Sequence, residues 1–328
     1  MKTPNLFDVA TSELSQDAFI TWLIQWGNQL YSSQNENLCK LAQHFIRFLM
    51  NKPEDYIIST VEAGRQWSNI DIWAQVNDTD AIIIEDKTIT KEHSNQLLRY
   101  KEIADKYYIP KNIKVHYIYL KTGNESIDNL KAIEDKGYRV ISRKEIINNL
   151  KAISVNSDIV TNFLYHLEEI ENETNSYDSV QRISSSWRAC EGFYLDIQER
   201  LLPEWSGWDY VPNASGGFMG FWYHWNSSKK FPEIYIQIEN SESEIKLVIK
   251  VSGPQISVES LYEALPILKK LGAENDLIIE KPNRYRAGNT ATLAIVKNAF
   301  DDSEFSVDKF FMILKLLEKV VDEFARSH

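Results

Sequence analysis

Hydrophobic and polar positions alternate with two different periods over the first 170 residues of the chain. A helix opening within residues 11–15 is predicted by four large apolar residues spaced three or one apart, Phe19, Trp22, Leu23 and Trp26. Short apolar runs bounded by polar turns are instead typical of strands. The pattern predicts helices near 11–26 and 36–49, strands over 56–61, 70–76 and 81–85, a helix over 91–107, a strand over 115–120, a helix over 127–135, a strand over 138–141 and helices over 143–150 and 158–170.

The segment 171–179, ENETNSYDS, is polar and has neither period, so we expect a linker there. In residues 1–170, a hairpin joined by the turn 77–80 is followed by a helix and a further strand. This order is typical of an α/β domain in which helices flank a mixed sheet. Residues 180–328 are predicted to form a separate α+β domain, with helices over 185–202, 258–271 and 307–325 and strands over 218–225, 233–239, 244–251, 276–280 and 290–296.

The composition is that of a globular protein: 328 residues, 43% hydrophobic, long enough for two cores. The two cysteines, Cys39 and Cys190, are far apart, which fits a reducing compartment. No apolar run approaches the roughly 20 residues of a membrane helix, and the first residues do not resemble a signal peptide. We therefore expect a cytoplasmic protein without a membrane partner.

The net charge of -11 argues against a protein that coats nucleic acid passively. A DNA-binding protein of this charge needs a local cationic groove. The richest source of cations is the stretch from Lys87 to Lys121, although each charge alone is most simply a solvated side chain on a helix.

Charged residues interrupt two neighbouring predicted strands. Asp71 lies within the strand 70–76, and the apolar strand 81–85 leads into Glu85, Asp86 and Lys87. Because side chains alternate along a strand, Glu85 and Lys87 share one face and Asp86 points the other way. If Asp71 lies on the face of Glu85, two carboxylates meet beside a lysine. Such a site suits a hard divalent cation that activates water and polarises a phosphoryl oxygen.

Charges at strand ends are usually only solvated, so this spacing alone is a weak signal. The context strengthens it, because the two strands are adjacent and the next helix has Gln96 and Tyr100 one turn apart on one face. Together these features favour a metal-dependent nuclease.

The same residues resemble the PD-(D/E)XK nuclease superfamily, through Asp71…Glu85-Asp86-Lys87 and the order of elements around it. The stretch Gln96–Tyr100, QLLRY, is similar to a bacterial and phage branch in which a Gln-Leu-x-x-Tyr helix follows Glu-x-Lys. The segment TSELSQDAFITWL also looks like that branch, whose first helix has an acid matching Glu13. One departure is Ile70, where the superfamily often has proline. The resemblance implies a restriction-endonuclease-like fold for residues 1–170.

The resemblance also implies roles for individual residues. Asp71, Glu85 and the carbonyl of Asp86 would be ligands of Mg²⁺ or Mn²⁺, and Lys87 would be the catalytic lysine. Glu13 is expected to be an accessory acid, Gln96 to touch the metal site or the phosphate backbone, and Glu62 to lie near the site. The expected nucleic-acid contacts are Lys91, Arg99 and Tyr100.

The second half resembles no family that we can name. Its aromatic residues are expected to pack in a core more than to stack on bases: Trp205, Trp208, Phe218, Phe221, Trp222, Tyr223 and Trp225. The loop 283–289, NRYRAGN, is basic and either contacts phosphate or is an ordinary turn. His224 and Cys190 are expected to be structural.

We therefore expect a Mg²⁺- or Mn²⁺-dependent endodeoxyribonuclease, with DNA as its partner and a C-terminal domain that recognises target, partner or trigger. Double-strand cleavage favours a homodimer, and the resemblance favours phage defence or restriction. Three alternatives stay open: a non-catalytic binding or regulatory protein on the same fold, an RNA-cleaving enzyme, and a nuclease gated by a nucleotide.

Overall fold

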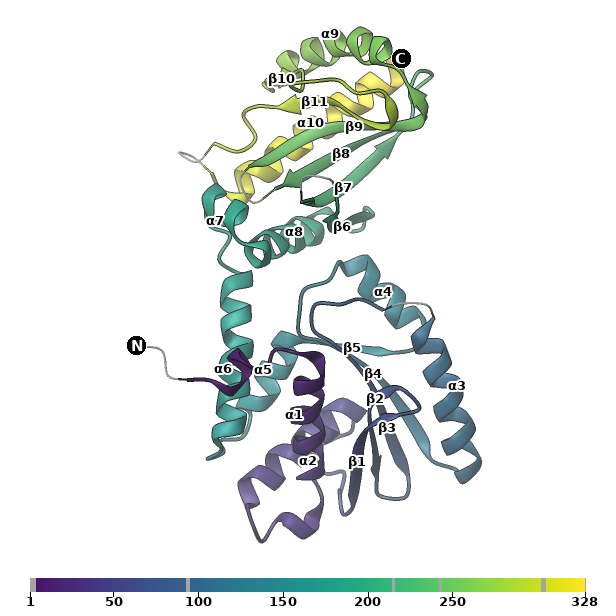
Figure 1. Cartoon of the computed structure of the whole chain (residues 1–328), viewed down its shortest axis with the longest axis vertical. Coiled ribbons are helices and arrows are strands. Elements are labelled where there is room, and N and C mark those ends of the chain that lie inside the picture. Colours follow the sequence, from purple (N-terminus) through teal and green to yellow (C-terminus); the bar gives the residue numbers. More distant parts are fainter. Residues whose placement is uncertain (1–3, 93–94, 214–215, 242–243, 302–304, 328) are drawn as a thin grey trace. The chain divides into compact units, whose positions relative to one another are not determined.

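The computed structural model describes residues 4–92, 95–213, 216–241, 244–301 and 305–327 (Figure 1). The chain divides into two compact units. The N-terminal unit comprises Met1–Glu125 and Asn129–Asn172, and the C-terminal unit comprises Ser126–Asp128 and Glu173–His328. None of the described helices has the length and apolar character needed to cross a membrane.

The N-terminal unit is built on a five-stranded mixed sheet in the order β1-β2-β3-β4-β5. Its first three strands are antiparallel, and β4 and β5 continue in parallel with β3. The strands are β1 (Val61–Trp67), β2 (Ile70–Val76), β3 (Asp80–Lys87), β4 (Lys114–Lys121) and β5 (Arg139–Ser142). The helices are α1 (Glu13–Gln25), α2 (Glu36–Met50), α3 (Gln96–Tyr108), α4 (Ile127–Asp135), α5 (Arg143–Lys151) and α6 (Asp158–Thr174), with 3₁₀ turns at Leu6–Asp8, Gln29–Tyr31 and Ile109–Lys111.

Both faces of this sheet are covered, which confirms the predicted mixed sheet flanked by helices. Ile72 and Ile84 point to the face covered by α1, α2 and α6, where Phe19, Phe45 and Phe163 join the same core. Ile83 points to the opposite face, which α3 covers with Tyr100 and other apolar side chains. Because β3 is covered on both sides, all eight of its residues are buried, including the charged ones at its end.

The C-terminal unit has a six-stranded antiparallel sheet in the order β10-β11-β9-β8-β7-β6. Its strands are β6 (Ser206–Val211), β7 (Phe218–Asn226), β8 (Glu233–Asn240), β9 (Ile245–Ile256), β10 (Ile279–Glu280) and β11 (Gly288–Val296). Its helices are α7 (Val180–Ser185), α8 (Trp187–Leu201), α9 (Val258–Glu274) and α10 (Val307–Ser327). Side chains of α8, α9 and α10 share one core with the inward residues of the sheet, such as Phe193, Phe221 and Leu314. This is the expected α+β unit.

Several predicted elements differ in the structure. The strand expected over 56–61 is not formed, because the Asn77 side chain accepts hydrogen bonds from the Ser59 and Thr60 amides at 2.9 and 3.2 Å. The first strand is instead β1, which starts at Val61. The helix expected from residue 91 starts at Gln96, and the one expected over 185–202 is α8. The short helix α7 before it and the strand β6 after it were not predicted. Helix α6 continues to Thr174, four residues into the expected linker.

Candidate functional site

The β2–β3 ladder brings the predicted acidic residues together. Ile72 pairs with Ile84 in antiparallel register, so the next step along the ladder sets Asp71 opposite Glu85. Residues opposite each other on neighbouring strands project to the same face. A hydrogen bond also joins the two strands at this point: the Asp86 amide donates to Asp71 Oδ2 at 3.1 Å.

The Lys87 ammonium lies at the centre of three carboxylates. Its Nζ is 2.6 Å from Glu85 Oε1, 3.7 Å from Glu13 Oε2 and 3.8 Å from Asp71 Oδ2. It also donates to the Asp86 carbonyl at 3.2 Å. Helix α1 and strands β2 and β3 thus each supply an acid to one point, and a single lysine neutralises only part of that negative charge.

Glu13 is the first residue of α1, where the helix dipole favours a negative charge. Its Oε1 accepts hydrogen bonds from the Thr88 amide at 3.2 Å and the Thr90 hydroxyl at 2.5 Å. Burial opposes its ionisation, but the hydrogen bond from Thr90 and the charge of Lys87 outweigh burial, and the pKa of Glu13 is lowered. Glu13 is therefore held as a carboxylate that faces Lys87.

Glu85 has the opposite electrostatic balance. Its side chain is fully buried, and burial followed by the negative charge of Asp71 raises its pKa to about 8 despite Lys87. The same cluster raises the pKa of Lys87, because the attraction of Glu85, Asp71 and Glu13 outweighs the burial that would lower it. The site is thus an electrostatically costly arrangement that favours bound protons or a bound cation.

The donor set fits a divalent cation. Glu85 Oε2 is buried and makes no hydrogen bond with any described group, so it retains coordinating capacity. The Asp71 carboxylate and the Asp86 carbonyl supply further oxygen atoms beside it. Oxygen donors of this kind are the ligands that Mg²⁺ and Mn²⁺ prefer.

A second acid pair, not predicted from the sequence, lies behind these residues. The Asp86 carboxylate points away from Lys87 toward α1, where Gln16 donates to its Oδ1 at 2.5 Å and Thr122 donates to Gln16 at 2.9 Å. Asp17 is its acidic neighbour, and burial followed by the charge of Asp71 raises the pKa of Asp17 to about 6. Burial and then Asp17 also raise the pKa of Asp86. The only sequence signal was a Gln-Asp pair on an otherwise apolar helix face.

A buried lysine connects β4 to the same region. Lys121 donates to the Thr90 carbonyl at 2.6 Å, and its Nζ lies 3.3 Å from Glu125 Oε2. Since the Thr90 hydroxyl donates to Glu13, Lys121 holds the segment that orients this acid. Burial lowers the pKa of Lys121 although Glu125 attracts its charge. In the sequence Lys121 is only the last residue of a cationic stretch, and no local signal indicates this buried position.

The helix after β3 places the remaining predicted residues. Gln96 donates to the Tyr100 hydroxyl at 2.8 Å, one turn along α3, and makes no described hydrogen bond to Asp71, Glu85 or Lys87. Tyr100 is 2% exposed and packs in the core under α3, so its position does not support the predicted nucleic-acid contact. Arg99 is exposed with its guanidinium 5.5 Å from the Tyr100 ring centre, while Lys91 is half-buried.

Glu62 does not lie near the site as the resemblance implied. It pairs with Gln75, four residues along β2 from Asp71 and so about 13 Å away. The residue that approaches Asp71 from β1 is Gln66, whose Nε2 is 3.5 Å from Asp71 Oδ1. Gln66 has a positive φ of 57° and lies opposite Asp71 in the β1–β2 ladder, between the pairs Arg65–Ile72 and Trp67–Ile70.

The C-terminal unit has a separate pocket of about 1000 Å³ over the sheet face formed by β8, β9 and β11. Two carboxylates line it, Glu239 and Glu244, together with five cationic side chains: Lys246, Lys250, Arg284, Arg286 and Lys297. The two arginines come from the basic loop 283–289 and are exposed. The excess of cations, five against two, makes this pocket suited to an anionic ligand.

The aromatic residues of this unit divide between core and surface. Phe221 and Tyr223 are fully buried and Trp208 is 4% exposed, as core packing requires. Trp205 and Trp225 are 54% and 40% exposed, and the Trp225 ring stacks on Tyr235 at a centroid distance of 5.1 Å. Cys190 is buried with a free thiol, consistent with a structural position.

The N-terminal half of the chain matches a known protein family. A family model described as the PD-(D/E)XK nuclease superfamily matches residues 4–179. No curated protein and no solved structure matches the chain. The match covers the whole N-terminal sheet with its Glu13, Asp71, Glu85 and Lys87 cluster.

Proposed function

Because this chain belongs to the PD-(D/E)XK nuclease superfamily, we propose that it is a metal-dependent endonuclease that hydrolyses DNA phosphodiester bonds at the Lys87 cluster. Membership in a superfamily that uses divalent metal ions suggests the chemical class. The observation that carries the residue assignment is the single lysine that contacts acids from α1, β2 and β3. A purely structural strand end would not place three carboxylates around one ammonium in the interior.

Asp71, Glu85 and the Asp86 carbonyl would hold the metal, which we propose to be Mg²⁺ or Mn²⁺. When bound, such an ion lowers the pKa of a coordinated water and polarises the phosphoryl oxygen. Lys87 is the one described cation that contacts this group, so it orients the attacking water or stabilises charge that develops on the phosphate. Glu13, held as a carboxylate by Thr88 and Thr90, keeps the ammonium protonated and directed into the site.

Contacts with the phosphate backbone would come from both units. Arg99 is exposed on α3, the helix that follows the catalytic strand. In the C-terminal unit, the cationic pocket with Arg284 and Arg286 is the surface that we propose for nucleic-acid recognition. One active site cuts one strand at a time and a double-strand break usually takes two, so we further propose a homodimer that acts in restriction or phage defence.

The test is cleavage of supercoiled plasmid, linear duplex and single-stranded DNA with Mg²⁺, Mn²⁺ or EDTA. Lys87→Ala is expected to lower the rate by at least about 100-fold, the usual loss when one preorganised charge is removed from an active site. Lys52→Ala is the matched control, because Lys52 is also ion-paired to a buried acid of β3, Asp80, at 3.0 Å.

Metal-dependent cutting that is lost in Lys87→Ala and kept in Lys52→Ala supports the assignment. Equal rates for Lys87→Ala and the wild-type chain would refute the role of Lys87. RNA substrates in the same assay decide between DNA and RNA, and the mass of the active species decides whether the enzyme is a dimer.

A further inference from the structure

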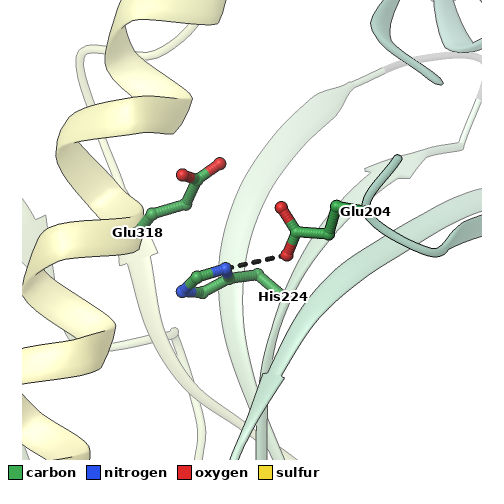
Figure 2. A group of neighbouring side chains, drawn as sticks. All are labelled: Glu204, His224 and Glu318. Carbon is green, nitrogen blue, oxygen red and sulfur yellow. Dashed lines mark hydrogen bonds and ion pairs between the residues drawn. The ribbon is translucent and has the colours of Figure 1, made fainter. Parts of the chain in front are cut away.

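The C-terminal unit contains a second group of potential metal ligands, formed by Glu204, His224 and Glu318 (Figure 2). Glu204 follows α8, His224 belongs to β7 and Glu318 to α10, so three separate segments supply them. One ligand atom from each lies within 4.8 Å of the others, and all three residues are half-buried. Ligand atoms this close need only a small side-chain shift to reach the bond lengths near 2 Å of a first-row divalent ion.

The imidazole of His224 is oriented from both sides. Its Nδ1 lies 2.9 Å from Glu204 Oε1, and its Nε2 lies 2.9 Å from Asp322 Oδ1. Asn226 also donates to this Asp322 oxygen at 3.1 Å, which fixes the carboxylate. A carboxylate that accepts from one ring nitrogen holds the other as a ligand, which is the usual outer support of a metal-binding histidine. The ring thus presents Nδ1 toward Glu204 and Glu318.

The backbone at His224 is in an unusual conformation. Its φ is 59°, a left-handed value that costs a residue with a Cβ atom stability, of order 1 kcal/mol. The strand bulges here, because Tyr223 pairs with Ile236 and Asn226 next pairs with Ile234, leaving two residues of β7 against one of β8. A bulge re-aims side chains, and here it turns His224 toward α10. Strained positions of this kind persist where the surrounding structure or a ligand demands them.

A buried hydroxyl points to the same place. The Tyr223 side chain is fully buried, and its hydroxyl meets hydrogen-bond geometry with no described group. The hydroxyl nevertheless lies near Glu318 and Glu204, because their negative charges add to burial in raising the pKa of Tyr223. A buried hydroxyl with poor hydrogen-bond geometry is costly unless a further ligand or its coordinated water completes the site.

We propose that Glu204, Nδ1 of His224 and Glu318 bind a divalent first-row transition-metal ion of the Zn²⁺ type. The imidazole nitrogen gives this site a different metal preference from the all-oxygen cluster around Lys87, because nitrogen ligands favour Zn²⁺ over Mg²⁺. Three protein ligands leave a position for water, within the environment of the Tyr223 hydroxyl. The ion would fasten α10 and the segment after α8 to the bulged strand β7.

A metal-free ionic clamp is the competing explanation, in which a His224 imidazolium donates to Glu204 and Asp322. That clamp leaves the Glu318 carboxylate facing the same group. The nearest cations to the acids lie at the rim: Lys315, 43% exposed, is 2.8 Å from Glu318, and Arg326, 76% exposed, is 3.8 Å from Asp322. One imidazolium together with these two rim cations equals the charge of the three carboxylates, so metal binding itself, and not charge balance, distinguishes the two explanations.

The test is equilibrium dialysis of the full chain against Zn²⁺ in an Asp71→Asn/Glu85→Gln background, which removes the acidic cluster near Lys87. We expect one Zn²⁺ per chain, undisturbed by millimolar Mg²⁺. Adding His224→Ala is expected to abolish this binding, and Asp322→Asn to weaken it about 10- to 100-fold by releasing the ring. The same chain loaded with Co²⁺ provides a visible absorption spectrum that reports the nitrogen ligand.

His44→Ala is the matched control, because the Nδ1 of His44 also lies 2.9 Å from a carboxylate, that of Glu54, but belongs to no such group among the described residues. Glu318→Gln is the second variant should His224→Ala not fold, because it removes a ligand while preserving shape. Zero Zn²⁺ per chain in the background, or binding that survives both His224→Ala and Glu318→Gln, overturns the proposal.

Discussion

The buried carboxylate of Glu85 leads to a prediction about stability that is independent of catalysis. In the metal-free protein, Glu85→Gln is expected to raise the free energy of unfolding, and the gain is expected to grow with pH. The reason is that burial and the neighbouring Asp71 charge raise the pKa of Glu85 from 4.5 to about 8. Glutamine keeps the shape of the side chain but has no charge to desolvate.

The sign follows from proton linkage. The folded state holds the Glu85 proton more tightly than the unfolded state does, so stability is fully present below pH 4.5 and is lost as pH rises toward about 8. Each unit of displaced pKa corresponds to about 1.4 kcal/mol. Between pH 5 and pH 8 the wild type is therefore expected to lose about 3 kcal/mol through this group, which Glu85→Gln does not lose. Loss of the Lys87 partner in the variant reduces the gain.

Urea unfolding between pH 5 and pH 8 in EDTA measures this difference for wild type and Glu85→Gln. Glu102→Gln, on the exposed face of α3, controls for the general effect of losing one negative charge. Added Mn²⁺ is expected to reverse the order, because it stabilises only the chain that retains the ligand. A difference between wild type and Glu85→Gln that stays flat with pH in EDTA would refute the reasoning.

Two further predictions concern the acid pair behind the site and the pocket of the C-terminal unit. Asp17→Asn is expected to stabilise the metal-free protein by about 1–2 kcal/mol at pH 8 and by little at pH 4, because burial raises the pKa of Asp17 to about 6. Thermal unfolding at the two pH values measures this stabilisation, and equal shifts at both values would contradict the prediction. Arg284→Ala is expected to weaken DNA binding and to lower the slope of log affinity against log salt by about 1, whereas Lys270→Ala, on the exposed side of α9 away from the pocket, leaves the slope unchanged.

The sequence predicted strands β2 and β3 well because their signals are local. The hairpin register of β2 and β3 follows from alternation and a short turn, and that register alone brings Asp71 and Glu85 together. The strand β1 escaped prediction because it is polar and largely exposed, so its pairing with β2 rather than its own pattern makes it a strand.

Local sequence patterns do not predict contacts between residues that are far apart in the chain. Gln16 contacts Asp86 from 70 positions away and Thr122 from 106 positions away. The orientation of His224 likewise depends on a bulge and on Asp322, neither of which leaves a periodic signal. Composition and spacing indicate which residues are available for chemistry, but tertiary packing decides which of them meet.

The two ends of β3 differ in how the charges of their buried acids are compensated. Asp80, the first residue of the strand, is as buried as Glu85, yet its charge is fully compensated: Oδ1 lies 2.6 Å from His116 and 3.0 Å from Lys52. Burial alone would raise its pKa, but these partners lower the pKa of Asp80. At the other end, burial prevails, and the pKa values of Glu85 and Asp86 are raised.

Replacing the buried acid by its amide is therefore expected to change the free energy of unfolding in opposite directions at the two ends of β3. Asp80→Asn breaks compensated contacts and is expected to cost about 3 kcal/mol at pH 7, whereas Glu85→Gln stabilises the metal-free chain. Unfolding free energies of the two variants, measured side by side in EDTA, give this contrast directly. If both substitutions destabilise the protein, the acids near Lys87 are satisfied without a metal, and the electrostatic argument for a cation at this end of β3 fails.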